Sequence, residues 1–273
     1  MRLPDPSSIP EFDLPFNDIE TPTIPLRVFR FPGGLEDPSR AVICVPGMAA
    51  SGVSFARLFP LSDLYDFRLL SGPVEAYPGG SRVPFAGAVE SILDRFENPV
   101  LLGTSFGGLV ALETASRSMG RLRGLVLPAA FARNHAFPGP LRVIEKILPR
   151  LQFLARLTAP IAARFVGGLR LDRDAARELA RQSSEVDPAE RGRRLEEVFE
   201  TDFRAVLPTI DLPSLVIHGS RDRLVSKRDA LELAALLPRS DYREIVEAGH
   251  MPYVSHPRQF NALLEEFLTD VFV

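Results

Sequence analysis

Residues 100–108 read Val100-Leu101-Leu102-Gly103-Thr104-Ser105-Phe106-Gly107-Gly108. The apolar run ends at Gly103, and apolar residues recur at helical spacing over 109–115. This pattern predicts a short buried strand, a tight turn with Ser105 at its apex, and a helix. Gly103 and Gly107 suit so sharp a turn because neither has a Cβ that would clash. Ser105 is either a nucleophile, as in Gly-x-Ser-x-Gly between a strand and a helix, or an ordinary helix cap.

Composition sets limits on the class of protein. The 273 residues carry a net charge of −3, so the whole chain has no bias toward nucleic acid. Hydrophobic residues make up 45% and charged residues 25%, which is typical of a globular protein. Cys44, the single cysteine, excludes an internal disulfide and is expected to be a small buried hydrophobe. No apolar run approaches the ~20 residues of a membrane-spanning helix, and residues 1–6 do not resemble a signal peptide, so we expect a cytoplasmic protein.

The order of the predicted elements indicates one α/β unit with an insertion. Residues 1–25 contain six prolines and are expected to form an extended arm on the surface. Strands are predicted at 26–31 (an edge strand), 41–45, 67–70, 100–103, 122–127, 214–218 and 242–246. Helices are predicted at 85–96, 106–119 with Gly120 as the stop, 228–237 and 258–271. Only helices are predicted within 131–207, at 141–157, 161–166, 173–183 and 188–201, so a helical cap splits a core of 26–130 and 208–273.

A nucleophilic serine needs a base, and the base needs an acid that orients it. Among the four histidines, His250 follows the last predicted strand, at the edge where open α/β sheets place their sites. Asp222 follows the preceding strand and is the expected acid, with a solvated turn aspartate as the alternative. We therefore expect Ser105, Asp222 and His250 to form a catalytic set.

The oxyanion formed by such an attack needs N–H donors aimed at it in advance. One candidate is the backbone N–H of Phe106, which directly follows Ser105. The second is that of Met48, in the loop after the strand 41–45, where the Pro46-Gly47 turn frees it. Three further residues are candidates for the substrate pocket: Ser51, His135 and Met251. For Ser51, a turn serine with no role in binding is an equally good interpretation.

Three motifs in this order resemble a known family. They are Gly103-Thr104-Ser105-Phe106-Gly107-Gly108, then His218-Gly219-Ser220-Arg221-Asp222-Arg223-Leu224-Val225, then Gly249-His250-Met251-Pro252 with His256-Pro257. Over 26–130 and 208–271 the chain resembles α/β-hydrolase fold proteins of the capped esterase and lipase kind. The resemblance implies a mostly parallel eight-stranded sheet flanked by helices, an inserted helical cap, and no metal or organic cofactor. In the loop expected to bind the oxyanion, the chain has Pro46-Gly47 where many relatives carry His-Gly. After the Gly-His-x-Pro motif, it has Ser255 where relatives often carry an acidic residue. Branches of the fold with an aspartate nucleophile are disfavoured by Ser105.

The first part of the predicted cap is strongly basic. Between 133 and 170 there are seven basic residues and one acid, a local charge of +6, interleaved with apolar residues. One interpretation is a solvated face of an amphipathic helix. The other is a docking surface for an acidic carrier protein or an anionic membrane surface, formed by Arg142, Lys146, Arg150 and Arg156.

The sequence thus predicts a serine hydrolase that cleaves a carboxylic ester through an acyl-enzyme, with a small-to-medium apolar acyl group. A thioesterase, a C–C bond hydrolase, or a hydrolase of carrier-linked acyl esters would use the same three residues. A protein of another class, which keeps the fold to bind a small ligand without turnover, is the remaining alternative.

Overall fold

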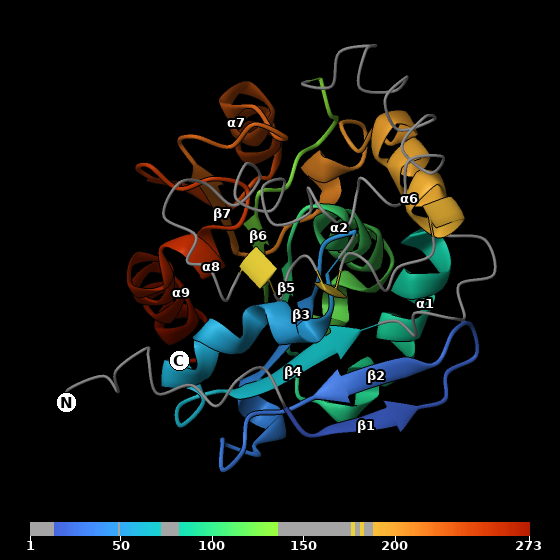
Figure 1. The fold of residues 1–273 in the computed structure, drawn as a ribbon, viewed down its shortest axis with the longest axis vertical. Helices are drawn as coiled ribbons and strands as arrows, with labels where there is room; N and C mark the ends of the chain where they lie inside the picture. The colour runs from blue at the N-terminus through green and yellow to red at the C-terminus, as the bar shows by residue number, and fades with distance from the viewer. Residues whose placement is uncertain (1–13, 49, 72–81, 136–175, 178–180, 183–187) are drawn as a thin grey trace.

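One mixed sheet organises the structure, a computed structural model that describes residues 14–48, 50–71, 82–135, 176–177, 181–182 and 188–273 (Figure 1). Its eight strands run in the order β1-β2-β4-β3-β5-β6-β7-β8. The pairs β1–β2 and β2–β4 are antiparallel and all the others are parallel. The predicted mostly parallel, eight-stranded sheet is therefore confirmed.

The strands alternate with helices along most of the described chain. The strands are β1 (Phe16–Ile19), β2 (Leu26–Phe29), β3 (Ala41–Val45), β4 (Asp66–Ser71), β5 (Val100–Gly103), β6 (Gly124–Pro128), β7 (Ser214–Gly219) and β8 (Ser240–Ile245). The helices are α1 (Arg82–Ile92), α2 (Phe106–Ser118), α6 (Pro188–Glu200), α7 (Lys227–Leu236), α8 (Pro252–Ser255) and α9 (Pro257–Val271). A 3₁₀ helix at Gly52–Leu61 follows β3.

Both faces of the central strands are covered, which explains why these strands read as unbroken apolar runs. Successive residues of a strand point to opposite faces. On β3, Ile43 and Val45 belong to one core cluster with apolar residues of α1, α2 and α7, whereas Val42 and Cys44 belong to another with residues of α8, α9 and the 3₁₀ helix. Cys44 is fully buried, as predicted. Within the described residues, no helix combines the length and apolar character needed to cross a bilayer.

The main differences from the predicted elements lie at the sheet edge and in the cap. Residues 26–31 were expected to form an edge strand, but β2 lies second because β1 pairs with it and takes the edge. The prolines on either side of Phe16–Ile19 obscured this short strand. α2 ends at Ser118, close to the predicted stop at Gly120, which lies in the 3₁₀ turn Met119–Arg121 and does not have a left-handed backbone. The predicted helix 188–201 is α6, while 141–157 and 161–166 lie outside the described residues.

Candidate active site

The turn between β5 and α2 has the geometry expected of a nucleophile elbow. Ser105 has φ +54° and ψ −118°, a strained conformation for a residue with a Cβ. A Cβ on Gly103 would lie 2.2 Å from the carbonyl oxygen of Gly107, and one on Gly107 would lie 2.2 Å from that of Val45. Both glycines are therefore required by close backbone approach, as predicted. A Gly-x-Ser-x-Gly motif indicates a nucleophile elbow when it lies between a strand and a helix, as it does here.

The loop after β3 lies against this turn. A Cβ built on Gly47 would be 3.6 Å from the Cβ of Ser105. The next residue along the loop is Met48, the predicted second oxyanion donor. The first, the N–H of Phe106, opens α2, where the first N–H groups have no partner within the helix. The two predicted donors thus flank the serine from two different segments, and their role in binding an oxyanion stays a prediction.

Asp222 and His250 form the clearest polar pair of the site. The two Asp222 carboxylate oxygens lie 2.9 and 3.1 Å from Nδ1 of His250, and the Asp222 side chain is fully buried. The backbone N–H groups of Leu224 and Val225 also donate to this carboxylate, at 2.8 and 3.0 Å. Because Nδ1 is held by the acid, Nε2 is the ring nitrogen left to exchange a proton with a substrate or a serine.

Electrostatics keep this acid ionised. Burial alone raises the pKa of the Asp222 carboxyl, but the charge and hydrogen bond of His250 and the N–H groups of Val225 and Leu224 outweigh it. The net pKa of Asp222 is therefore below its ordinary value. An ionised acid on Nδ1 stabilises the imidazolium that forms when histidine accepts a proton.

The structure brings Asp222 together with His250, at the carboxyl ends of β7 and β8. Ser105 lies at the carboxyl end of β5, in the same sheet. That His250 takes the proton of Ser105 stays a prediction. It is supported by the position of both residues at the carboxyl ends of strands in one sheet.

The three predicted pocket residues occupy different surroundings. Ser51 donates its backbone N–H to Oε1 of Gln182 at 2.9 Å. Met251 is partly buried, precedes α8 and accepts backbone bonds from Val254 and Ser255 through its carbonyl. His135 lies against α7 (see below). Whether any of the three lines a substrate pocket stays a prediction.

His135, Asp229 and Glu232 are a group of described residues that could hold a cation, with ligand atoms all within 4.8 Å of one another. Hydrogen bonds account for most of this arrangement. Nδ1 of His135 lies 2.7 Å from Oδ1 of Asp229, and Asp229 forms a capping box with Ser226 at the start of α7. The group therefore serves the start of α7 and gives no reason to assign a metal.

Sequence reasoning missed two residues that contact the loop after β3, Gln182 and Arg194. Gln182 accepts the N–H of Ser51, and Nη1 of Arg194 donates to the carbonyl of Met48 at 2.6 Å. Both are buried polar side chains. Arg193 and Arg194 are neighbours of the same type in the charged sequence of α6, yet Arg193 is exposed and Arg194 is buried. The local sequence therefore does not show which of the two contacts the loop.

Comparisons with known proteins agree on the fold. The model of the alpha/beta hydrolase family matches residues 38–263. The chain is 32% identical over 244 residues to the pimeloyl-[acyl-carrier protein] methyl ester esterase of Stenotrophomonas maltophilia (strain K279a), covering 83% of this chain and 92% of that protein. The enol-lactonase from Burkholderia xenovorans LB400 has a TM-score of 0.79 at 19% identity, covering 93% and 100%. The meta-cleavage product hydrolase of Pseudomonas fluorescens IP01 has a TM-score of 0.75 at 20% identity, covering 93% and 97%. The predicted α/β-hydrolase fold is confirmed.

Proposed function

Since the chain belongs to the alpha/beta hydrolase family and is an ester hydrolase, we propose that Ser105, His250 and Asp222 carry out the hydrolysis as a catalytic triad. The observation that carries this proposal is the buried Asp222–His250 pair, at the same sheet edge as the strained Ser105 turn. A serine in such a turn, followed along the chain by an acid and then a histidine, is the order of triad residues in this fold.

The mechanism follows from these positions. His250, oriented by Asp222, takes the proton of Ser105 as the hydroxyl attacks the ester carbonyl. The N–H groups of Phe106 and Met48 hold the oxyanion. The leaving alcohol receives its proton from His250, and water then hydrolyses the acyl-enzyme by the same route. Each of these groups comes from this chain, so the reaction needs no other reactant than ester and water.

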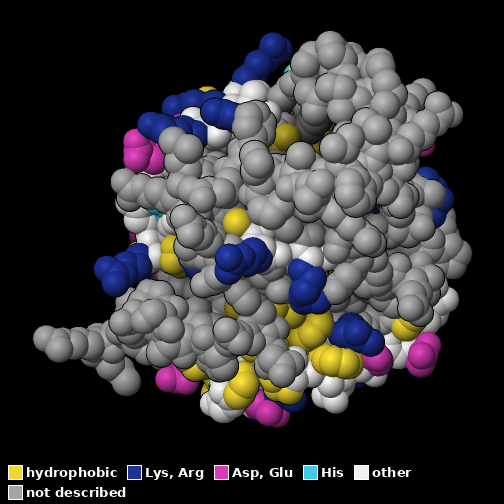
Figure 2. Space-filling view, in the orientation of Figure 1, with side chains coloured by type: hydrophobic (Ala, Val, Ile, Leu, Met, Phe, Trp, Pro, Cys, Tyr) yellow, Lys and Arg dark blue, Asp and Glu magenta, His cyan; other side chains and the backbone are white. Residues whose placement is uncertain are grey.

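For the substrate, we propose an ester whose acyl chain is attached to an acidic carrier protein. The Stenotrophomonas relative, which the chain matches over most of its length, is named for the methyl ester of a pimeloyl group on an acyl-carrier protein. The basic segment 133–170 has the charge that would complement an acidic carrier. Its proposed docking residues, Arg142, Lys146, Arg150 and Arg156, lie outside the described residues. Figure 2 shows described basic side chains at several places on one face, some of them close together at the upper left.

The test of the triad is hydrolysis of p-nitrophenyl esters with acyl chains from short to long, beside Ser105→Ala. We expect turnover by the wild type and loss of at least about 10⁴-fold in kcat for the variant. The acyl length of highest kcat/KM would size the binding site. Ester hydrolysis that persists in Ser105→Ala would overturn the triad. A folded wild type that hydrolyses none of these esters would exclude a general esterase and leave carrier-linked esters, thioester cleavage, C–C cleavage or ligand binding.

The test of the carrier is a comparison of two methyl esters with the same acyl chain, one attached to an acidic carrier protein and one free. Changing Arg142 and Arg150 to Glu should raise KM for the carrier-linked ester about tenfold and leave the free ester unaffected, because steering acts on the charged partner. Arg95→Glu is the matched control, since Arg95 is exposed near the amino end of β5, opposite Ser105. Equal KM values for all three proteins would contradict carrier docking.

A further inference from the structure

Two side chains of the inserted segment hold the loop after β3, at Met48 and at Ser51. Arg194, on α6, donates from Nη1 to the carbonyl of Met48 at 2.6 Å. Gln182 accepts the N–H of Ser51 through Oε1 at 2.9 Å. Only 8% of Arg194 and 2% of Gln182 is exposed, so both bonds are shielded from water. A charge-assisted hydrogen bond of this length is among the stronger polar contacts in a protein.

These two hydrogen bonds lie at the part of the loop that carries the proposed oxyanion donor, the N–H of Met48. The loop's own backbone bond, from the N–H of Ala50 to the carbonyl of Gly47, is 3.2 Å long. Gly47 allows wide backbone rotation, so a contact from outside the loop at Met48 restricts it further. The carbonyl and the N–H of Met48 belong to the two peptide groups joined at its Cα, so holding the carbonyl also restricts where the N–H can point.

The same arginine also contacts the residue that carries the other proposed donor. Cζ of Arg194 lies 5.7 Å from the ring centroid of Phe106, within the range of a cation–π contact. One guanidinium thus touches Met48 and Phe106, which belong to two separate segments. Their relative position is what an oxyanion hole depends on.

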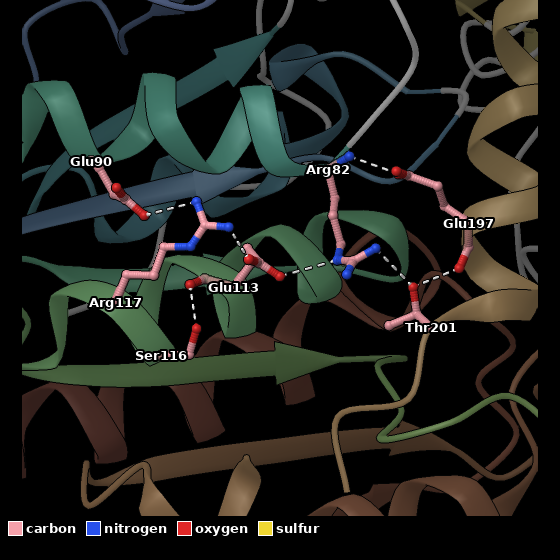
Figure 3. A network of polar contacts seen from close by, with 7 residues as sticks. All are labelled: Arg82, Glu90, Glu113, Ser116, Arg117, Glu197 and Thr201. Atoms are coloured by element: carbon pink, nitrogen blue, oxygen red, sulfur yellow. Dashed lines mark hydrogen bonds and ion pairs between the residues drawn. The ribbon is translucent and has the colours of Figure 1, made fainter. Parts of the chain in front are cut away.

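The helix that carries Arg194 is itself fixed to the core by a polar network (Figure 3). Glu197 accepts the backbone N–H of Arg82 at 2.6 Å, and the Arg82 guanidinium reaches Thr201 and Glu113, each at 3.2 Å. Glu113 belongs to α2, the helix that Phe106 opens. Because residues three apart on a helix are neighbours, Arg194 lies close to the anchored Glu197.

We propose that Arg194, assisted by Gln182, is a positioning residue for the oxyanion hole, so that the inserted segment completes the hydrolytic site. The inference rests on the proposed function, because it takes Met48 and Phe106 as the donors. Arg194 acts through the backbone of Met48 and the ring of Phe106, and it takes no part in the covalent steps. Its removal should therefore weaken the transition state more than substrate binding.

The test is kinetic, on a p-nitrophenyl ester, with Arg194→Met, Arg194→Lys and Gln182→Met. Arg194→Met should lower kcat by about 10- to 100-fold, because a displacement near 1 Å in a catalytic site can cost about 10²-fold. KM should change by less than about twofold, since ground-state binding is not the term removed. Arg194→Lys should recover part of kcat by donating one hydrogen bond to the carbonyl of Met48. The exposed Arg193→Met is the matched control on the same helix and should keep the wild-type kcat.

A second readout separates positioning from folding. A trifluoromethyl ketone forms an oxyanion on the serine, whereas the parent methyl ketone with the same chain binds as a ground-state ligand. In Arg194→Met, the inhibition constant of the first should rise in parallel with the loss of kcat, and that of the second should stay unchanged. If Arg194→Met does not fold, Arg194→Lys and Gln182→Met, each expected to lower kcat with KM unchanged, carry the same test.

Two results would overturn the inference. One is a folded Arg194→Met with wild-type kcat, and the other is a rise in KM with kcat unchanged, which would make Arg194 a substrate-binding residue. Ser105→Ala in the same assay distinguishes failure of the proposed function from failure of this inference. If Ser105→Ala retains activity, the triad is wrong. If Ser105→Ala is inactive while Arg194→Met has normal activity, only the role of Arg194 is wrong.

Discussion

Gly107→Ala tests whether the close approach of α2 to β3 creates the site. A Cβ at Gly107 would lie 2.2 Å from the carbonyl oxygen of Val45, 2.5 Å from that of Pro46 and 2.8 Å from the carbonyl carbon of Val45. All three are backbone atoms, so no side-chain rotation relieves the overlap. Restoring an ordinary contact of 3.4 Å requires a shift of roughly 1.2 Å at the base of the loop that carries Met48.

The magnitude follows from that shift. Overpacking a well-packed region costs typically about 1–3 kcal/mol, and a clash among backbone atoms belongs at the upper end, so we expect a loss of about 3 kcal/mol in the free energy of unfolding. The loop displacement should lower kcat/KM by about 100-fold or more. Urea unfolding followed by circular dichroism measures the first quantity, and turnover of a p-nitrophenyl ester measures the second.

Gly120→Ala is the matched control for this substitution. A Cβ there meets nothing within 4 Å, and the backbone of Gly120 is not in the left-handed region. Alanine at such a position should leave activity unchanged and stabilise the protein by up to about 1 kcal/mol, by restricting the unfolded chain. If Gly107→Ala instead had wild-type stability and activity, the reasoning about the elbow would be refuted.

Four further predictions concern the site and the core. Ser105→Gly should be more stable in urea than Ser105→Ala by about 1 kcal/mol or more, because glycine relieves the strain of φ +54°; equal stabilities would mean that the turn stores no strain. Asp222→Asn should lower kcat by about 10⁴-fold, through loss of the ionised partner of His250. Since the pKa of Asp222 is lowered in the folded state, its ionised form stabilises the protein above the ordinary carboxyl pKa of 3.8, and urea midpoints should show the stability gap to Asp222→Asn closing as pH falls through the lowered value. Burial raises the pKa of the Cys44 thiol well above its ordinary value, so iodoacetamide at pH 8 should alkylate it in urea and leave it intact in the native protein; rapid native labelling would contradict that burial.

The sequence was most informative where local chemistry decides the structure. The glycines on either side of Ser105 predicted a sharp turn, and the 2.2 Å approaches at Gly103 and Gly107 explain why no other residue fits. Strand ends were similarly informative, because parallel strands bring their carboxyl ends to one edge. Asp222 and His250 were therefore predicted to meet, and they do.

Long-range contacts were beyond sequence reasoning. Arg194 is 146 residues from Met48, and Gln182 is 131 residues from Ser51. Helical periodicity gives the face of a helix but not the loop that this face meets. β1 was missed because prolines lie on either side of it and because, being short and mostly exposed, it lacks the apolar pattern of the central strands.

Covalent labelling of the wild-type protein with a fluorophosphonate, followed by intact-mass and peptide mass spectrometry, shows directly whether Ser105 is the nucleophile. We expect one adduct per chain, located on Ser105, absent from Ser105→Ala and formed far more slowly in His250→Ala. Ester hydrolysis that continues without an adduct, or an adduct on any other residue, would contradict the assignment of Ser105 as the nucleophile.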